Sequence, residues 1–244
     1  MKYIIVVQMK KMELKNVVRI IVSLCIMFFT LLCLYRMYQM YKKSYGVIEP
    51  YMDVSAGYEL PRVIPQFVSE SERIHLITTA EDNLSPSTIS SDKVVDTSVR
   101  KSDTSWVHHT DPIAKEIMTR ASALVGRTWK HCESIQVLRY SVDGQYKPHY
   151  DAHCFATGDG GDIVRGGQRI ATVLIALNDG YQGGSTNFPN LKRSFKMQPK
   201  DALLFHNLDK AGKCTRDSLH GGDVVTDGTK WVANVWIHEN ERVT

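Results

Sequence analysis

In the stretch Lys230-Trp-Val-Ala-Asn-Val-Trp-Ile-His238, two kinds of side chain alternate, as in a β-strand whose two faces are both buried but meet different surroundings. One face would be entirely apolar and would pack into a core: Trp231, Ala233, Val235 and Ile237. The other face would line a cavity: Lys230, Val232, Asn234, Trp236 and His238. A buried lysine is costly unless it meets an anion. The strand therefore predicts that Lys230 binds a carboxylate.

The stretch Pro148-His-Tyr-Asp151 contains two candidate metal ligands, because His149 and Asp151 would project from the same face of a strand. Two imidazoles and one carboxylate on one face of a metal leave three positions open, which is typical of non-haem Fe(II) oxygenases. His220 would supply the second imidazole. Spacing alone leaves His206 open, since Arg216 follows it by ten residues just as Lys230 follows His220. The strand that begins at Lys230 favours His220.

Five ordered blocks, taken together, resemble the catalytic domain of a prolyl 4-hydroxylase, an Fe(II)- and 2-oxoglutarate-dependent dioxygenase. The similarity is greatest to the short single-chain forms of algae, plants and large algal viruses. The blocks are Arg139–Asp151, Gly166–Thr172, Gly183–Pro189, Pro199–Phe205 and a last block from Asp217 to His238. Lysine at position 230 favours this branch over related hydroxylases that tend to use arginine there.

The resemblance implies four catalytic residues, of which three bind Fe(II) and one binds the distal carboxylate of 2-oxoglutarate. The iron ligands are His149, Asp151 and His220, and the carboxylate receptor is Lys230. Further contacts to 2-oxoglutarate are implied for Tyr140, Thr172 and His238. Contacts to the peptide substrate are expected from Arg169, Trp106 and Trp236, although Trp236 fits packing better than chemistry. Dioxygen is the other co-substrate, and L-ascorbate would rescue iron left in the oxidised state.

The expected reaction is 4-hydroxylation of peptidyl proline in proline-rich or collagen-like sequences, coupled to oxidative decarboxylation of 2-oxoglutarate to succinate and CO2. Such substrates favour polyproline II, which is already extended and loses little conformational entropy on binding. One alternative is a 2-oxoglutarate oxygenase that acts on another peptidyl side chain. The other is a catalytically silent module that binds proline-rich peptides, against which the intact ligand set and Lys230 both count.

The N-terminus differs in composition from the rest of the chain. Residues 1–44 hold eight Lys+Arg and one Glu, which leaves 22 Lys+Arg and 25 Asp+Glu for the remainder, so the overall charge of +4 comes from this segment. Residues 17–35 are largely apolar and as a helix would extend about 28 Å. We expect an uncleaved, single-pass membrane anchor with a lumenal catalytic domain in the endoplasmic reticulum, the alternative being a buried core helix. Charge of this distribution argues for lipid headgroups and against nucleic acid.

The expected fold class is mostly β with flanking helices, with a double-stranded β-helix (jelly-roll) core over residues 134–240. The expected domains are an anchor (1–44), a stem (45–60) and a catalytic domain (61–244). A capping box at Ser69 predicts a helix to about Glu81, and Asp111 before Pro112 predicts a second helix that ends at Gly126. The predicted strands are residues 135–140, 168–177, 202–205 and 230–238.

Two long connections and the cysteines leave alternatives open. Residues 85–109 would be either a lid that closes over the peptide or a strand with a linker, and the glycine-rich residues 155–167 would be a substrate clamp. Cys132, Cys154 and Cys214 permit at most one intramolecular disulfide. Asn83 begins a glycosylation sequon that is followed by proline. The oligomeric state is open and a monomer would be compatible with the sequence.

Overall fold

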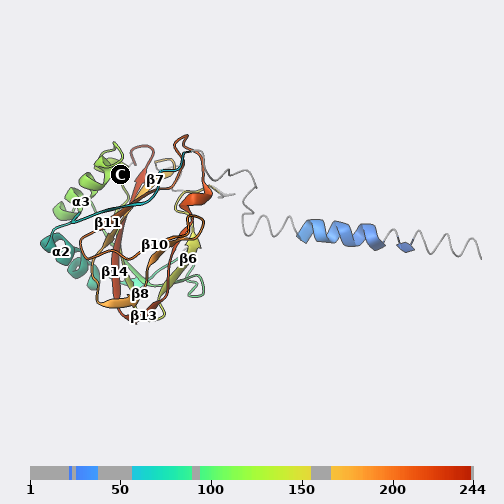
Figure 1. Cartoon of the computed structure of the whole chain (residues 1–244), viewed down its shortest axis with the longest axis horizontal. Helices are drawn as coiled ribbons and strands as arrows, with labels where there is room; N and C mark the ends of the chain where they lie inside the picture. The colour runs from blue at the N-terminus through green and yellow to red at the C-terminus, as the bar shows by residue number, and fades with distance from the viewer. Residues whose placement is uncertain (1–21, 24–25, 38–56, 90–93, 155–165, 243–244) are drawn as a thin grey trace, which may run out of the picture. The chain divides into compact units, whose positions relative to one another are not determined.

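The computed structural model describes residues 22–23, 26–37, 57–89, 94–154 and 166–242 (Figure 1). The chain divides into two compact units, Met1–Glu49 and Pro50–Thr244. The second unit contains all of the strands and is described first.

Two antiparallel sheets form the second unit, as a jelly-roll fold requires. The larger one, here called the major sheet, has the order β1 (Arg62–Ile64), β11 (Ala202–His206), β7 (Arg169–Ala176), β14 (Lys230–His238), β5 (Ile135–Tyr140), β4 (Asp103–Val107) and β2 (Ser85–Pro86). The minor sheet has the order β10 (Arg193–Phe195), β9 (Thr186–Phe188), β12 (His220–Gly222), β6 (Gln145–His149) and β3 (Arg100–Lys101). A separate pair joins β8 (Tyr181–Gly183) to β13 (Val225–Gly228). The predicted β class and the four predicted strands are confirmed.

Two helices cover the major sheet on the side away from β6 and β10 (Figure 1). The first is α2 (Glu70–Glu81), in which Ser69 and Glu72 form the predicted capping box. The second is α3 (Pro112–Ala123), whose N-cap Asp111 accepts a hydrogen bond from the backbone N–H of Ala114. Short 3₁₀ turns occupy Trp129–His131 and Arg216–Ser218.

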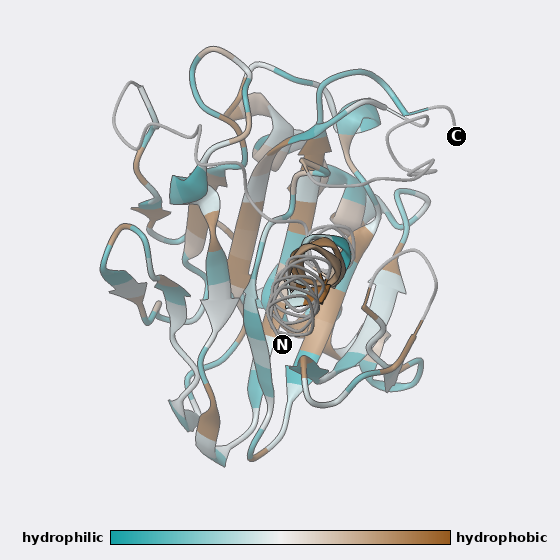
Figure 2. Cartoon of the chain, turned by 90° about the vertical axis from the view of Figure 1, so that its right-hand side faces the viewer, coloured by the Kyte–Doolittle hydropathy of each residue, from teal (hydrophilic) through white to brown (hydrophobic). Residues whose placement is uncertain are grey.

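The strand β14 lies at the centre of the major sheet, paired with β5 and β7. Its predicted apolar face is buried against the helices, in a core cluster that holds Trp231, Ala233, Val235 and Ile237 together with Leu76, Ile117 and Met118. A second core cluster fills the space between the sheets and includes Phe188, Phe205, Leu203, Leu138 and Val232. Figure 2 shows the apolar residues concentrated on the strands and the loops largely hydrophilic. The two faces of β14 therefore have different surroundings, as the alternation predicts.

The connection between the helices, predicted as a lid or as a strand with a linker, contains three short strands. Strands β2 and β4 extend the edge of the major sheet, and β3 pairs with β6 at the edge of the minor sheet. This segment thus joins the two sheets along one side of the fold. The glycine-rich clamp predicted over residues 155–167 lies almost wholly outside the described residues.

A disulfide joins Cys154 to Cys214, with 5.8 Å between their Cα atoms, whereas Cys132 is buried and free. Cys154 follows Asp151 by three residues, and Cys214 precedes His220 by six. The disulfide therefore ties together the two chain segments that carry these candidate ligands.

In the first unit, residues 22–23 and 26–37 are helical. Among the described residues, no helix has both the length and the apolar character needed to cross a membrane. This finding contradicts the predicted single-pass anchor, and with it the predicted location in the endoplasmic reticulum. The predicted stem falls mostly outside the described residues.

Candidate active site

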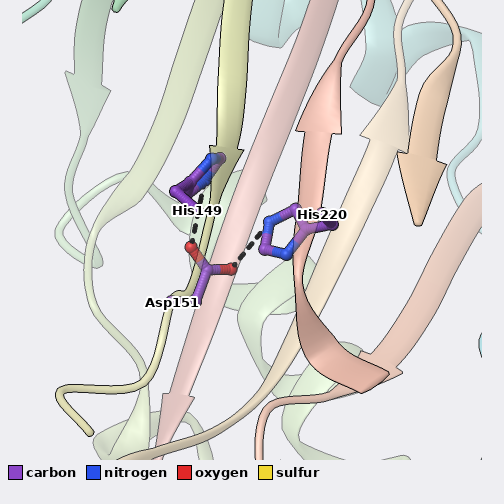
Figure 3. Close-up of side chains that lie close together, drawn as sticks. All are labelled: His149, Asp151 and His220. Atoms are coloured by element: carbon purple, nitrogen blue, oxygen red, sulfur yellow. Dashed lines mark ion pairs between the residues drawn. The ribbon is translucent and has the colours of Figure 1, made fainter. Parts of the chain in front are cut away.

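The side chains of His149, Asp151 and His220 converge between the two sheets (Figure 3). His149 and His220 face each other as register partners on β6 and β12. The Nε2 atom of His149 lies 3.7 Å from Asp151 Oδ1, and the Nε2 atom of His220 lies 3.6 Å from Asp151 Oδ2. Within the part of the chain that the structure describes, this is the one group of three such side chains that could hold a metal ion.

Both imidazoles are held in the tautomer that a metal site needs. The Nδ1–H group of His149 donates to the carbonyl of Lys147 over 2.9 Å, and that of His220 donates to the carbonyl of Ser218 over 2.9 Å. Nε2 of each ring is therefore the nitrogen with a free lone pair. Burial and the neighbouring His220 lower the pKa of His149 to about 3, so that ring is neutral at pH 7. The Nε2 atoms of the two rings thus point at one carboxylate.

Asp151 carries the negative charge of the group. Burial alone would raise its pKa, but His220, His149 and a hydrogen bond from Thr172 together lower it. The sequence had suggested that His149 and Asp151 lie on one strand. Strand β6 ends at His149, however, so Asp151 lies two residues beyond it. The donor set of two imidazole nitrogens and one carboxylate suits Fe(II) and leaves open positions for other ligands.

A β-bulge brings an unexpected aromatic residue to the same side. His220 and Gly222 on β12 are two residues apart, whereas their register partners on β6, His149 and Tyr146, are three residues apart. Tyr146 therefore stacks on His149 with 3.6 Å between ring centroids, and the guanidinium of Arg100 lies 4.6 Å from the Tyr146 ring centroid. Strict strand alternation would have placed Tyr146 on the opposite face.

Lys230 lines a cavity that the two histidines also line. Tyr140 is its register partner on β5, and the Lys230 ammonium lies 5.3 Å from the Tyr140 ring centroid. Lys230 has no hydrogen bond or ion pair to any residue that the structure describes, and burial lowers its pKa to about 8. Gly184, at φ +63°, leaves room for the lysine stem, because a Cβ there would lie 3.2 Å from Lys230 Cδ. An unpaired buried cation in a cavity fits an incoming carboxylate.

Two residues expected to contact 2-oxoglutarate have other partners. The hydroxyl of Thr172 donates to Asp151 Oδ2 over 2.7 Å, and Nδ2 of Asn207 donates to Thr172 over 3.0 Å. His238 is fully buried, with Nε2 2.8 Å from Oε1 of Glu133. Neither Thr172 nor His238 lines the cavity, whereas Tyr140 does.

The residues expected to meet the peptide lie together, and none of them lines the cavity. Arg169 binds Glu133 and places its guanidinium 4.1 Å from the ring centroid of Trp236. Trp106 on β4 pairs with Trp236 at 6.1 Å between centroids and is 44% exposed. The indole N–H of Trp236 is buried without an acceptor among the described residues.

Sequence reasoning missed Glu133, Tyr146 and Asn207. Only Tyr146 had a usable signal, its position three residues before His149 inside a recognised block. Glu133 and Asn207 acquire their partners through pairings between distant strands. His206, the rival ligand, lies at the end of β11 outside the three-residue group, and its carbonyl accepts a hydrogen bond from Tyr58.

The sequence matches the family described as the 2OG-Fe(II) oxygenase superfamily over residues 135–238. A protein of Acanthamoeba polyphaga mimivirus, provisionally named prolyl 4-hydroxylase, is 33% identical over 193 residues, which cover 78% of this chain and 79% of the relative. Prolyl 4-hydroxylase 5 of Arabidopsis thaliana is 32% identical over 202 residues, covering 73% of this chain and 68% of the relative. The chain belongs to the prolyl 4-hydroxylase family. It is an Fe(II)- and 2-oxoglutarate-dependent dioxygenase, and the predicted resemblance is confirmed.

Other relatives show how much of a longer or a shorter enzyme this dioxygenase covers. Human prolyl 4-hydroxylase subunit alpha-3 is 33% identical over 211 residues, but these cover only 37% of that protein. The crystal structure of the viral collagen prolyl hydroxylase of Paramecium bursaria Chlorella virus-1 with 2-oxoglutarate superposes with a TM-score of 0.57 at 26% identity. That alignment covers 73% of this chain and 96% of the viral enzyme. The dioxygenase therefore spans the length of a short viral enzyme and about a third of an animal alpha subunit.

Proposed function

We propose that the protein hydroxylates peptidyl proline at C4, with His149, Asp151 and His220 as the iron ligands. The observation that carries the proposal is the pair of imidazoles whose Nε2 atoms lie 3.7 and 3.6 Å from the two oxygens of a single carboxylate. When bound, Fe(II) supplies the activation of dioxygen, while 2-oxoglutarate is decarboxylated to succinate and CO2. One oxygen atom of O2 enters the proline and the other enters succinate.

Lys230 is proposed as the receptor of the distal carboxylate of 2-oxoglutarate. Its ammonium lies in the same cavity as the two histidines and lacks an anionic partner among the described residues. A charge-assisted hydrogen bond in this buried place would fix the co-substrate with its other end toward the metal. Tyr140, beside Lys230, is proposed as a second contact.

Trp106, Trp236 and Arg169 are proposed as the surface for a proline-rich peptide. Two indole rings at 6.1 Å offer apolar faces to a proline ring, and the buried Trp236 N–H lacks an acceptor that a peptide carbonyl could supply. A polyproline II segment has no internal backbone hydrogen bonds, so its carbonyls are free to accept one. Collagen-like sequences are one such class, and the related viral enzyme is named for collagen.

The test is turnover of 2-oxoglutarate with a proline-rich peptide, measured by succinate release and by mass spectrometry of the peptide. His149→Ala, Asp151→Ala and His220→Ala should each abolish both signals, whereas His206→Ala should retain them. Loss with His206→Ala and survival with His220→Ala would overturn the ligand assignment. Identification of the modified residue as anything other than 4-hydroxyproline would support the alternative of another side chain. Omission of L-ascorbate, the proposed rescuer of oxidised iron, should shorten the time for which turnover continues.

The proposed catalytic domain comprises residues 61–244, within the compact unit Pro50–Thr244. We expect that deletion of residues 1–49 leaves folding and turnover intact, because the core clusters and the candidate site lie wholly in that unit. Equal melting temperatures and equal turnover of the full and shortened chains are the expected result. A shortened chain that folds but has lost turnover would contradict this division.

A further inference from the structure

Two hydrogen bonds in series connect Asp151 to Thr172 and Thr172 to Asn207. The hydroxyl of Thr172 lies 2.7 Å from Asp151 Oδ2, and Nδ2 of Asn207 lies 3.0 Å from the Thr172 hydroxyl. All three side chains are buried, with Asn207 0%, Thr172 1% and Asp151 5% exposed. Thr172 lies on β7, and Asn207 directly follows β11, where its backbone N–H donates to the carbonyl of Ile170. Two neighbouring strands of the major sheet thus fix this series of hydrogen bonds.

The direction of these hydrogen bonds follows from the charge of Asp151. An ionised carboxylate can only accept, so the single proton of Thr172 is donated to it. Thr172 oxygen is then an acceptor, and the amide N–H of Asn207 is the donor that satisfies it. The competing contact, from Thr172 to Oδ1 of Asn207, is longer at 3.4 Å. Successive donors that point the same way strengthen one another in a buried site.

We propose that Asn207 and Thr172 are positioning residues that keep Asp151 a one-oxygen ligand. The inference rests on the proposed iron site and adds the state of its carboxylate. The hydrogen bond from Thr172 fixes the plane of the carboxylate and draws charge from Oδ2, so Oδ1 would be the more basic oxygen for the metal. Hydrogen-bonded carboxylates around metal sites are commonly oriented in this way.

The consequence concerns the number of open coordination positions. Three protein atoms on a six-coordinate metal would leave three positions, which 2-oxoglutarate and dioxygen would share. If both oxygens of Asp151 were bound, one of these positions would be lost. Neither Asn207 nor Thr172 lines the cavity, so we expect them to act through Asp151.

The test uses the full-length protein with Co(II) as the probe, in the absence of oxygen and 2-oxoglutarate. Thr172→Val removes the hydroxyl and keeps the shape, and we expect it to weaken Co(II) binding by about 10- to 100-fold. The d–d absorption of Co(II), which reports coordination number, should change in Thr172→Val. Thr172→Ser restores the hydroxyl and should recover most of the affinity and the wild-type spectrum.

Thr104→Val is the matched control. Thr104 is also buried, and its hydroxyl lies 2.6 Å from that of Ser87. Thr104 is on β4 and Ser87 directly follows β2, and neither strand carries a candidate metal ligand. It should lose stability as any buried hydroxyl pair does, but should bind Co(II) as the wild type does. Asn207→Leu, which removes the donor to Thr172, should change affinity and spectrum in the same direction as Thr172→Val, by less.

Wild-type affinity and spectrum in Thr172→Val would overturn the proposal, as would a Thr172→Ser protein as impaired as Thr172→Val. If Thr172→Val does not fold, Asn207→Leu decides, and an unchanged Co(II) spectrum there would overturn the proposal. Failure of the iron site itself is distinguishable, because the wild type would then bind Co(II) no better than His220→Ala.

Discussion

Two buried charged sites of this fold have opposite electrostatic character. Glu133 lies within 3.4 Å of Arg169, His238 and Arg242, and these four residues are here called the Glu133 cluster. Burial alone would raise the pKa of Glu133, but His238 and the two arginines outweigh it and lower the pKa to about 2. Lys230 has no such partners, and burial lowers its pKa to about 8.

The directions of the two pKa shifts distinguish a charge that stabilises the fold from a charge that is available to bind a ligand. In the Glu133 cluster, the folded protein favours the charged form of the Glu133 carboxyl more than water does, so this charge stabilises the fold. At Lys230 the charged form is disfavoured, so the fold bears a cost that only an incoming anion can offset. Perturbed groups of the second kind in a cavity are the better indicators of a ligand site.

The largest expected effect is on stability, from Glu133→Gln. It removes the buried carboxylate that Arg169 and Arg242, both partly buried, share, and breaking a buried ion pair typically costs about 3–5 kcal/mol of unfolding free energy. Half-saturation by 2-oxoglutarate should stay near the wild-type value, because the cluster does not line the cavity. Urea titration and a 2-oxoglutarate titration measure the two quantities. A stability loss below about 1 kcal/mol, as for exposed ion pairs, would remove the distinction between the sites.

The opposite pattern is expected for Lys230→Met, which keeps the length of the side chain and removes its charge. Loss of the partner of a desolvated carboxylate costs roughly 2–5 kcal/mol, or about 30- to 4,000-fold in 2-oxoglutarate half-saturation. Fe(II) binding should be retained and the free protein should be no less stable than the wild type. Lys130→Met is the control, because it removes the same charge from an exposed position. The Lys130 ammonium forms a surface ion pair with the Glu241 carboxylate at 3.8 Å. An unchanged half-saturation in Lys230→Met would mean that the carboxylate is held elsewhere.

Alternation along a strand was sufficient to predict the Lys230 side of this comparison. The period of two in residues 230–238 gave the apolar outer face and the inward lysine, and both are observed. It failed where the backbone departs from that period: the bulge opposite β12 turns Tyr146 toward His149, and Asp151 lies beyond the end of β6.

The Glu133 cluster could not be predicted, because no local pattern marks it. Glu133 and His238 are 105 residues apart and meet only through the pairing of β14 with its neighbours. The partner of Thr172 was missed for the same reason, since Asn207 reaches it across the β7–β11 pair. The N-terminal prediction rested on composition alone, and among the described residues no helix is long and apolar enough to cross a membrane.

The smallest expected effect is a pH dependence that belongs to Lys230 alone. Its folded pKa of about 8 lies below the 10.5 of a free lysine, so between these values the unfolded chain binds more protons than the folded one. Stability of the ligand-free protein due to this group must then rise with pH, from about pH 8 to 10.5. Lys230→Met lacks the group, and any excess stability of the variant at pH 7 should shrink by about 2 kcal/mol at pH 9.5.

Binding should respond with the reverse sign, because 2-oxoglutarate needs the ammonium form. Its affinity should fall as pH rises above about 8, by up to about tenfold per unit, as the empty site must first take up a proton. Urea unfolding of both proteins at pH 7 and 9.5, with chelator and without 2-oxoglutarate, isolates the stability term. A difference between wild type and Lys230→Met that does not change with pH would mean that Lys230 is already paired in the free protein. The contrast with the Glu133 cluster would then be lost.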